Sequence, residues 1–402
     1  MIDLFWRHFF SLLLIVVAIA EWVCATWLLA YPGGIVLPWP LHIAGPMLLY
    51  AVNRRIARQP AGRTALIRKA YTRAAFTSLF GFTLLLLVGA AWAVASTGLY
   101  VAGVGPEARV FLLVGQSARA LASVGLLSVA AAMAYAYARG AHRLWINRLR
   151  VWMPNLPRAA QGLRIVQISD IHAGPFLAED TLKRFVEEVN ALEPDLVFIT
   201  GDLADTVPDA ERLLPLLKDL RASLGVYAVL GNHDRSAGES AIAEVLRQST
   251  SVRLLCDEIV ELPGRASGIY LAGLRDRGLD WARGLRNCSI LASLVRQVPQ
   301  EAPKILLSHR PDLFGQAEAL GIGLVLSGHT HGGQLAIPLP GRRPLSLARF
   351  MTRYPRGTYR SGSCTLHVNL GLGVTGQPVR LATPREITLI ELADASAPAA
   401  AA

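Results

Sequence analysis

Two long apolar segments near the start of the chain restrict its fold more than any other feature. Residues 9–30 contain one charged side chain and residues 74–96 contain none. A helix needs about 20 apolar residues to cross the hydrocarbon core of a bilayer, so each segment can span it. Residues 35–52 and 110–138 are also apolar, although the first holds three prolines and the second holds an arginine. We therefore predict an all-α transmembrane bundle of about four helices within the first 150 residues.

The positive charge of the chain lies in this first part. Residues 1–158 hold 15 Lys and Arg against 3 acidic residues, whereas the remainder holds 25 against 26. The connection 53–73 and the stretch 139–158 are rich in arginine and contain no acid. The positive-inside rule places both of them in the cytoplasm. We therefore predict a multi-pass protein of the cytoplasmic (inner) membrane whose carboxyl-terminal domain is cytoplasmic.

Two charged side chains lie within the predicted spans. Glu21 and Arg119 are each about nine residues from the outer end of their span, roughly 14 Å at 1.5 Å per residue. Intramembrane charges usually face a partner or a cavity, so we predict a structural ion pair between them. A lipid-headgroup or transport site is the alternative. The first span has an alternative of its own, a signal peptide cleaved after Ala20.

From residue 163 onward, short apolar runs alternate with amphipathic segments. The spacing predicts strands at 163–168, 196–199 and 226–230, with helices at 179–192 and 209–220 between them. Later strands are predicted at 269–272, 305–307, 324–326, 366–369 and 387–391. This alternation is typical of an α/β domain, in which polar residues at the carboxyl ends of strands gather at one edge of the sheet. We place this domain at 163–392, after a linker at 151–162 and before a disordered tail at 393–402.

Five of the predicted strands are followed at once by short polar sequences. These are "SDIH" at 169–172, "TGDL" at 200–203, "GNHD" at 231–234, "SHRP" at 308–311 and "SGHTH" at 327–331. Seven of their side chains are candidate metal ligands: Asp170, His172, Asp202, Asn232, His309, His329 and His331. Each motif alone is also typical of a solvated turn. The five together, each at the carboxyl end of a strand, indicate a site.

The seven donors are oxygens and imidazole nitrogens, and none is a thiolate. That set suits Mn, Fe, Zn or Mg better than a cysteine-bound zinc. Seven donors exceed what one tetrahedral ion needs, but they suffice for two divalent ions that share a bridging carboxylate. His329 and His331 are two residues apart, so in an extended segment they share one face and can each reach a different ion. Asp205 and Asp234 are candidates for orienting the histidines, with solvated turn residues as the alternative.

In their order, these motifs resemble the five sequence blocks of the calcineurin-like metallophosphoesterases. The resemblance covers roughly residues 163–392, and "GHTHGGQ" and "NLGLG" (369–373) are most similar to its bacterial membrane-anchored branch. It implies a four-layer α/β/β/α metallophosphoesterase sandwich. It also implies the ligands: Asp170, His172 and His331 for the first ion, Asn232, His309 and His329 for the second, and Asp202 for both. By the same resemblance, His233 is the general acid, and Asn232 also stabilises charge on the phosphoryl oxygens.

The activity implied is hydrolysis of a phosphodiester, phosphomonoester or pyrophosphate by attack of a metal-activated hydroxide. The stretch 341–360 holds six arginines and no acid, interleaved with apolar and aromatic residues. It can rest on an anionic membrane, hold a second phosphate, or be a solvated basic loop. Together with the membrane helices it favours a lipid-linked substrate.

Two alternatives to this function stay open. The first is a non-catalytic metal-binding or scaffold protein on the same fold. The second is a nuclease of the same family, which the charge balance after residue 158 disfavours because nucleic-acid binding needs a basic surface. We therefore expect no nucleic-acid partner.

Overall fold

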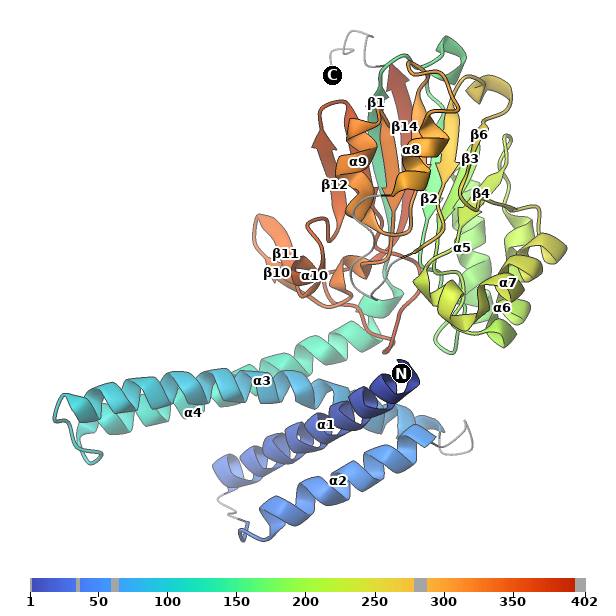
Figure 1. Ribbon diagram of the computed structural model, residues 1–402. Helices are drawn as coiled ribbons and strands as arrows, with labels where there is room; N and C mark the ends of the chain where they lie inside the picture. The colour runs from blue at the N-terminus through green and yellow to red at the C-terminus, as the bar shows by residue number, and fades with distance from the viewer. Residues whose placement is uncertain (1, 34–36, 59–64, 278–287, 395–402) are drawn as a thin grey trace. The chain divides into compact units, whose positions relative to one another are not determined.

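The computed structural model describes residues 2–33, 37–58, 65–277 and 288–394 (Figure 1). The chain divides into two compact units, Met1–Tyr135 and Ala136–Ala402.

The first unit is entirely helical. Its helices are α1 (Ile2–Gly33), α2 (Leu41–Arg58), α3 (Ala65–Val101) and α4 (Arg109–Ala138). Among the described residues, three helical segments are long and apolar enough to cross a bilayer, and they lie in α1, α3 and α4. The predicted span at 35–52 is not one of them. Its first two residues lie outside the described residues, and α2 instead continues into three arginines, so too few apolar residues are left to cross.

The predicted ion pair between Glu21 and Arg119 is wrong. Glu21 accepts a hydrogen bond from Asn53, with 2.8 Å between Oε2 and Nδ2. Arg119 donates from Nε to the carbonyl of Gly115, one turn earlier in its own helix, at 3.3 Å. The partner of Glu21 thus comes from α2, at a residue just after the predicted span 35–52.

The second unit begins with a mixed sheet of six strands. Parallel strands β2, β3 and β4 form its centre, and β14 joins β2 in the antiparallel sense. In order across the sheet the strands are β1 (Leu144–Met153), β14 (Arg385–Asp394), β2 (Arg164–Ile168), β3 (Leu196–Thr200), β4 (Val226–Val229) and β5 (Arg253–Leu254). All residues of β3 and β4 are buried, as expected for strands that are covered on both faces.

A second six-stranded sheet has four parallel strands flanked by two antiparallel edges. In order they are β12 (Gly357–Ser361), β13 (Cys364–Val368), β9 (Leu324–Ser327), β8 (Lys304–Leu307), β7 (Tyr270–Gly273) and β6 (Glu258–Glu261). A separate hairpin of β10 (Ala336–Leu339) and β11 (Arg342–Ser346) precedes the short helix α10 (Ala348–Met351).

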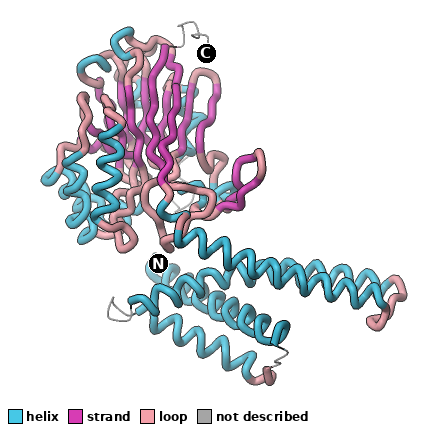
Figure 2. Tube along the Cα trace, turned by 180° about the vertical axis from the view of Figure 1, so that it is seen from behind, coloured by secondary structure: helices cyan, strands magenta, loops and turns pink. Residues whose placement is uncertain are grey.

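Helices cover the outer face of each sheet, as Figure 1 and Figure 2 show. One apolar core lies between the sheets and contains Phe198 of the first and Leu326 of the second. A second core lies between the first sheet and its helices, and a third between the second sheet and its helices. The covering helices are α5 (Glu179–Ala191), α6 (Val207–Leu213) and α7 (Asn232–Ser249) on the first sheet, and α8 (Ser289–Val295) and α9 (Phe314–Ala319) on the second. The predicted four-layer α/β/β/α sandwich is confirmed.

The boundaries of the domain differ from the expected ones because of β1. This strand lies partly in the expected membrane domain and partly in the expected linker at 151–162, and it pairs in parallel with β14 along its whole length. Its buried Val151 and Met153 alternate with exposed Arg150 and Trp152. Arg148 and Arg150, two of the five arginines in the stretch 139–158, therefore belong to an edge strand. At the other end, β14 continues to Asp394, and residues 395–402 of the expected tail lie outside the described residues.

The core between the sheets supplies a test of the fold. Phe198 is fully buried there, so we expect Phe198→Ala to lower the free energy of unfolding by about 3–5 kcal/mol. Phe176 is 40% exposed, and Phe176→Ala is the matched control, with an expected change within about 0.5 kcal/mol. Urea unfolding of the detergent-solubilised chain measures both. Equal losses for the two variants would contradict the sandwich.

Candidate metal centre

The sequence-predicted ligands come together at the carboxyl ends of strands from both sheets. Asp170 and His172 follow β2, Asp202 follows β3, and Asn232 begins α7 after β4. The second sheet contributes the other three candidate ligands, His309 after β8 and His329 and His331 after β9. The site therefore lies where loops of the two sheets meet.

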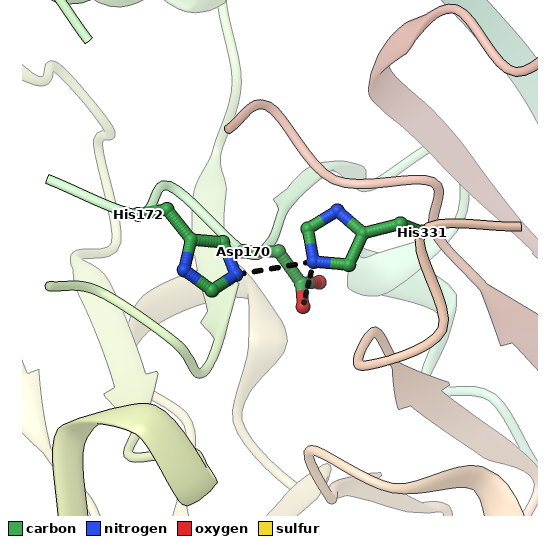
Figure 3. A group of neighbouring side chains, drawn as sticks. All are labelled: Asp170, His172 and His331. Carbon is green, nitrogen blue, oxygen red and sulfur yellow. Dashed lines mark hydrogen bonds and ion pairs between the residues drawn. The ribbon is translucent and has the colours of Figure 1, made fainter. Parts of the chain in front are cut away.

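The first group of donors consists of Asp170, His172 and His331, all of them buried (Figure 3). The Nε2 atoms of His172 and His331 are 3.1 Å apart. The Nε2 atom of His331 is also 3.5 Å from Oδ1 of Asp170. Two imidazole nitrogens and a carboxylate oxygen thus point at one place.

The second group consists of Asp202, His309 and His329, with Asn232 beside it. The Nε2 atom of His309 lies 3.2 Å from Oδ2 of Asp202, from Nδ1 of His329 and from Oδ1 of Asn232. One nitrogen carries at most one proton, so it cannot satisfy three acceptors at once. Acceptors that converge in this way are candidate ligands for a cation. The donor chemistry fits Mn, Fe, Zn or Mg.

Asp202 faces both groups. Its Oδ2 is 3.2 Å from Nε2 of His309 and 3.7 Å from Nε2 of His172. Its Oδ1 accepts a hydrogen bond from the backbone N–H of His233 at 2.8 Å. Burial opposes ionisation of this carboxyl group, but the charge and hydrogen bond of His309 outweigh burial and hold the pKa of Asp202 well below its usual value.

Five of the seven donors have a left-handed backbone. The φ angles are +48° at Asp170, +45° at His172, +53° at Asp202, +72° at His329 and +49° at His331. Residues other than glycine rarely adopt this conformation, and such strain persists only where the surrounding structure imposes it. Here the backbone N–H of Asp170 is bonded to the carbonyl of Gly201, and that of His172 to the carbonyl of Asp202.

The expected extended geometry at His329 and His331 is wrong. Both have positive φ angles, Thr330 between them is in the right-handed helical region, and a 3-10 turn, η6 (His331–Gly333), follows. The two histidines nevertheless lie in different donor groups. The backbone reversal at each of them, and not a shared face, sends one ring to each group.

Asp205 orients two histidines. Its Oδ1 accepts from Nδ1 of His172 at 2.7 Å and lies 3.6 Å from Nδ1 of His233. Burial would raise the pKa of Asp205, but the hydrogen bonds from these two rings lower it to about 2. A proton on Nδ1 of His172 leaves its Nε2 lone pair directed into the first group.

Asp234 has a different role from the expected one. Among the described residues it forms no hydrogen bond or ion pair with a histidine, and it accepts from the backbone N–H groups of Leu203, Ala204 and Gly231, at 2.8, 3.0 and 2.8 Å. Its side chain is fully buried. Burial, and then the charge of Asp202, raise the pKa of Asp234 to about 7. Asp234 ties the loop after β3 to the loop after β4, and so it fixes the two loops that carry Asp202 and Asn232.

Two arginines at the site were not assigned from the sequence. Arg310 is buried, its Nη1 is 3.1 Å from Nε2 of His329, and its Nε donates to Asp276 at 2.7 Å. Arg380 is fully buried, with Nη2 3.3 Å from Nδ1 of His331. It also donates to backbone carbonyls of residues 370–373. Arg310 is part of the "SHRP" motif, so the sequence did offer a signal for it. Arg380 lies in no motif, and it donates mainly to backbone carbonyls, which every residue type has.

The contact between the two sheets at Gly328 supplies a test of the first donor group. A Cβ atom at this position would overlap Ser169 Oγ and Asp170 Oδ2. We therefore expect Gly328→Ala to displace the Asp170 carboxylate and to lose most of the metal of this group, measured by plasma mass spectrometry of the purified protein. Gly315→Ala in α9 is the matched control, because its Cβ would meet nothing within 4 Å. An unchanged metal content in Gly328→Ala would contradict this assignment.

The comparisons with known proteins agree with this architecture. A model of the calcineurin-like phosphoesterase family matches residues 163–333. The metallophosphoesterase Cj0846 of Campylobacter jejuni is 34% identical over 61% of this chain and 63% of its own length. YkuE of Bacillus subtilis is 31% identical over 67% of this chain and 93% of its own length. A zebrafish (Danio rerio) transmembrane protein with metallophosphoesterase domain is 33% identical over 68% of this chain and 62% of its own length.

This chain therefore spans less than two thirds of the Campylobacter and zebrafish proteins and nearly all of the Bacillus protein. Among solved structures, TT1561 of Thermus thermophilus aligns with 53% of this chain and 91% of its own, at 14% identity and a TM-score of 0.37. The identity to YkuE over almost its full length shows that the chain belongs to the calcineurin-like metallophosphoesterase family.

Proposed function

We propose that the protein is a membrane-anchored phosphoesterase that uses two divalent metal ions to hydrolyse a phosphodiester, phosphomonoester or pyrophosphate. The observation that carries this proposal is the position of Asp202, whose Oδ2 faces both donor groups. Asp170, His172 and His331 would hold the first ion, and Asn232, His309 and His329 the second. Asp202 would bridge them.

The ions, when bound, supply Lewis acidity to the phosphoryl oxygens and lower the pKa of water to give a nucleophile for in-line displacement. The chain's own residues then orient the ester. Asn232 is at the amino end of α7 beside the second group, where its amide can donate to a phosphoryl oxygen. Arg310 is held by Asp276 against His329 and adds a fixed positive charge there.

His233 is placed to move a proton. Its side chain is 38% exposed, in contrast to the buried rings around it. Its ring packs edge to face on His172, with 4.7 Å between centroids, and its Nδ1 faces Asp205. With Nδ1 held by that carboxylate, Nε2 is the nitrogen that can donate to a leaving-group oxygen. His233 is therefore our candidate for the general acid.

The membrane helices support an anchored enzyme. The apolar segments 11–30 and 69–101 lie in α1 and α3, and the segment 109–142 comprises α4 and the short turn η1 (Gly140–His142) after it. The zebrafish and cattle (Bos taurus) relatives are named as transmembrane proteins. Because the connection 53–73 and the stretch 139–158 are basic, we propose that the phosphoesterase domain lies in the cytoplasm, at the inner membrane. An amphiphilic, lipid-linked ester is the substrate class that best suits such an enzyme.

Two substitutions separate metal binding from proton transfer. We expect Asp202→Asn to lose metal and activity together, because the bridging charge is removed. We expect His233→Asn to keep its metal and to lose about 10²- to 10⁴-fold in turnover, the usual contribution of a general acid. Metal analysis and hydrolysis of bis(p-nitrophenyl) phosphate by the purified full chain measure both. A metal-loaded wild type without activity on phosphodiesters, phosphomonoesters and pyrophosphates would favour the non-catalytic alternative, and cleavage of DNA would favour a nuclease.

The orientation has its own test. Green fluorescent protein fused after Ala402 should fluoresce if the domain is cytoplasmic, whereas alkaline phosphatase fused at the same point should be inactive. An active alkaline phosphatase fusion would place the domain on the other side of the membrane. That result would leave the hydrolytic chemistry untouched.

A further inference from the structure

Exposed apolar side chains are concentrated in one short part of the phosphoesterase unit. Of the eight large apolar side chains that are exposed in its described residues, five lie within residues 337–350. They are Ile337 (61% exposed), Leu339 (36%), Leu345 (41%), Leu347 (74%) and Phe350 (77%). We call residues 336–354, which comprise β10, β11, α10 and the turn after it, the amphiphilic segment. In both views its hairpin stands out from the sandwich (Figure 1 and Figure 2).

The same segment carries a concentrated positive charge. Arg342, Arg343, Arg349 and Arg353 are all exposed, and the segment contains no acidic residue. Within the described part of the chain, no carboxylate forms an ion pair with any of the four, whereas Arg212, Arg247 and Arg253 elsewhere on the surface each have one. A cavity of about 410 Å³ beside α10 is lined by Arg349, Phe350 and Arg353, among others.

The amphiphilic segment is built onto the metal loop. β10 begins two residues after Gln334 of the "GHTHGGQ" motif. A Cβ at Gly333 would lie 2.6 Å from Cβ of Ser346 and 3.4 Å from Cβ of Ala348, so β11 and α10 pack directly on η6. Thr330, between His329 and His331, donates from Oγ1 to the carbonyl of Pro355, the residue directly after the segment, at 2.7 Å. The segment thus adjoins the donor groups.

A solvated basic loop accounts for the arginines but not for five exposed apolar side chains. A site for a second phosphate would likewise explain the arginines but not the exposed apolar side chains. An anionic bilayer surface accounts for both, because apolar side chains enter the boundary between headgroups and acyl chains while arginines bind lipid phosphates. The apolar helices of the same chain place it at a bilayer.

We propose that the amphiphilic segment docks on the surface of a bilayer that contains anionic lipid. Leu347 and Phe350 enter the headgroup region, and Arg342, Arg343, Arg349 and Arg353 contact lipid phosphates. The inference goes beyond the proposed hydrolytic function and does not depend on it.

An environment-sensitive fluorophore at position 347 tests the docking in the full chain. Leu347→Cys is labelled with nitrobenzoxadiazole in a Cys256→Ser background, since Cys256 is an exposed native thiol, and the background protein gives the blank. The chain is reconstituted in nanodiscs of phosphatidylcholine, with or without phosphatidylglycerol, that carry a nitroxide-labelled lipid. Ser251→Cys is the matched control, because Ser251 is exposed before β5, at the amino ends of the strands and away from the metal centre.

We expect nitroxide lipid to quench the probe at 347 in discs with phosphatidylglycerol, and not the probe at 251. High salt should release the amphiphilic segment from the bilayer and reduce the quenching at 347, since the contacts are charged and exposed. Removing one arginine near an anionic surface weakens binding about fivefold, so Arg342→Gln with Arg349→Gln should weaken docking about 25-fold.

Equal quenching at 347 and 251 would overturn the proposal. Quenching at 347 that changed neither with salt nor with phosphatidylglycerol would overturn it as well. If the fluorescence of the probe at 347 depended on protein concentration and not on the lipid, the segment would bind a second copy of the chain. That result would also overturn the proposal. Hydrolysis of bis(p-nitrophenyl) phosphate in the same samples keeps the two proposals apart. Loss of quenching with intact hydrolysis defeats the docking alone, and quenching without hydrolysis defeats the proposed activity alone.

Discussion

The phosphoesterase unit is organised around one buried carboxylate. Asp202 directs Oδ2 towards histidines of both donor groups, and its Oδ1 holds the backbone of His233. A buried negative charge is tolerated only beside positive charge or hydrogen-bond donors. The two sheets meet this need together, since His172 comes from the first sheet and His309 from the second. The sandwich is thus the arrangement that surrounds Asp202 with enough donors to hold two cations.

Holding the donors requires backbone strain. Left-handed φ angles at Asp170, His172 and Asp202 occur directly after buried parallel strands, whose ladders fix the chain up to the turn. Asp234 then bonds three N–H groups of the adjoining loops, and the backbone N–H of His329 donates to both oxygens of Asp170 at 3.0 and 3.1 Å. The strain therefore lies in loops that these hydrogen bonds fix, and the bonds orient the candidate ligands.

The sequence was enough to predict the elements that have a periodic apolar pattern and the candidate ligands that directly follow the strands. The strands that carry the donors, among them β2, β3 and β9, were found because apolar runs ended in polar residues. β1 was missed because arginines that alternate with apolar residues after a span also satisfy the positive-inside rule. The sequence could not predict the turn at His329 and His331 or the roles of Asp234 and Arg380, for another reason. They depend on bonds to backbone groups, which any residue type can supply.

The proposed docking of the amphiphilic segment would explain the charge pattern of the phosphoesterase unit. After residue 158 the chain is close to neutral, yet six of its arginines fall within residues 341–360 without one acid. Interspersed charges of both signs would serve solubility better, and five exposed apolar side chains beside them oppose it. A surface that is anionic and apolar at once, as in the docking that we propose, would make both features favourable. Because Ser346 and Ala348 pack on Gly333 of the loop that carries His331, docking as we propose it would bring a lipid surface close to the donor groups. The proposed lipid-linked ester would then reach them without leaving that surface.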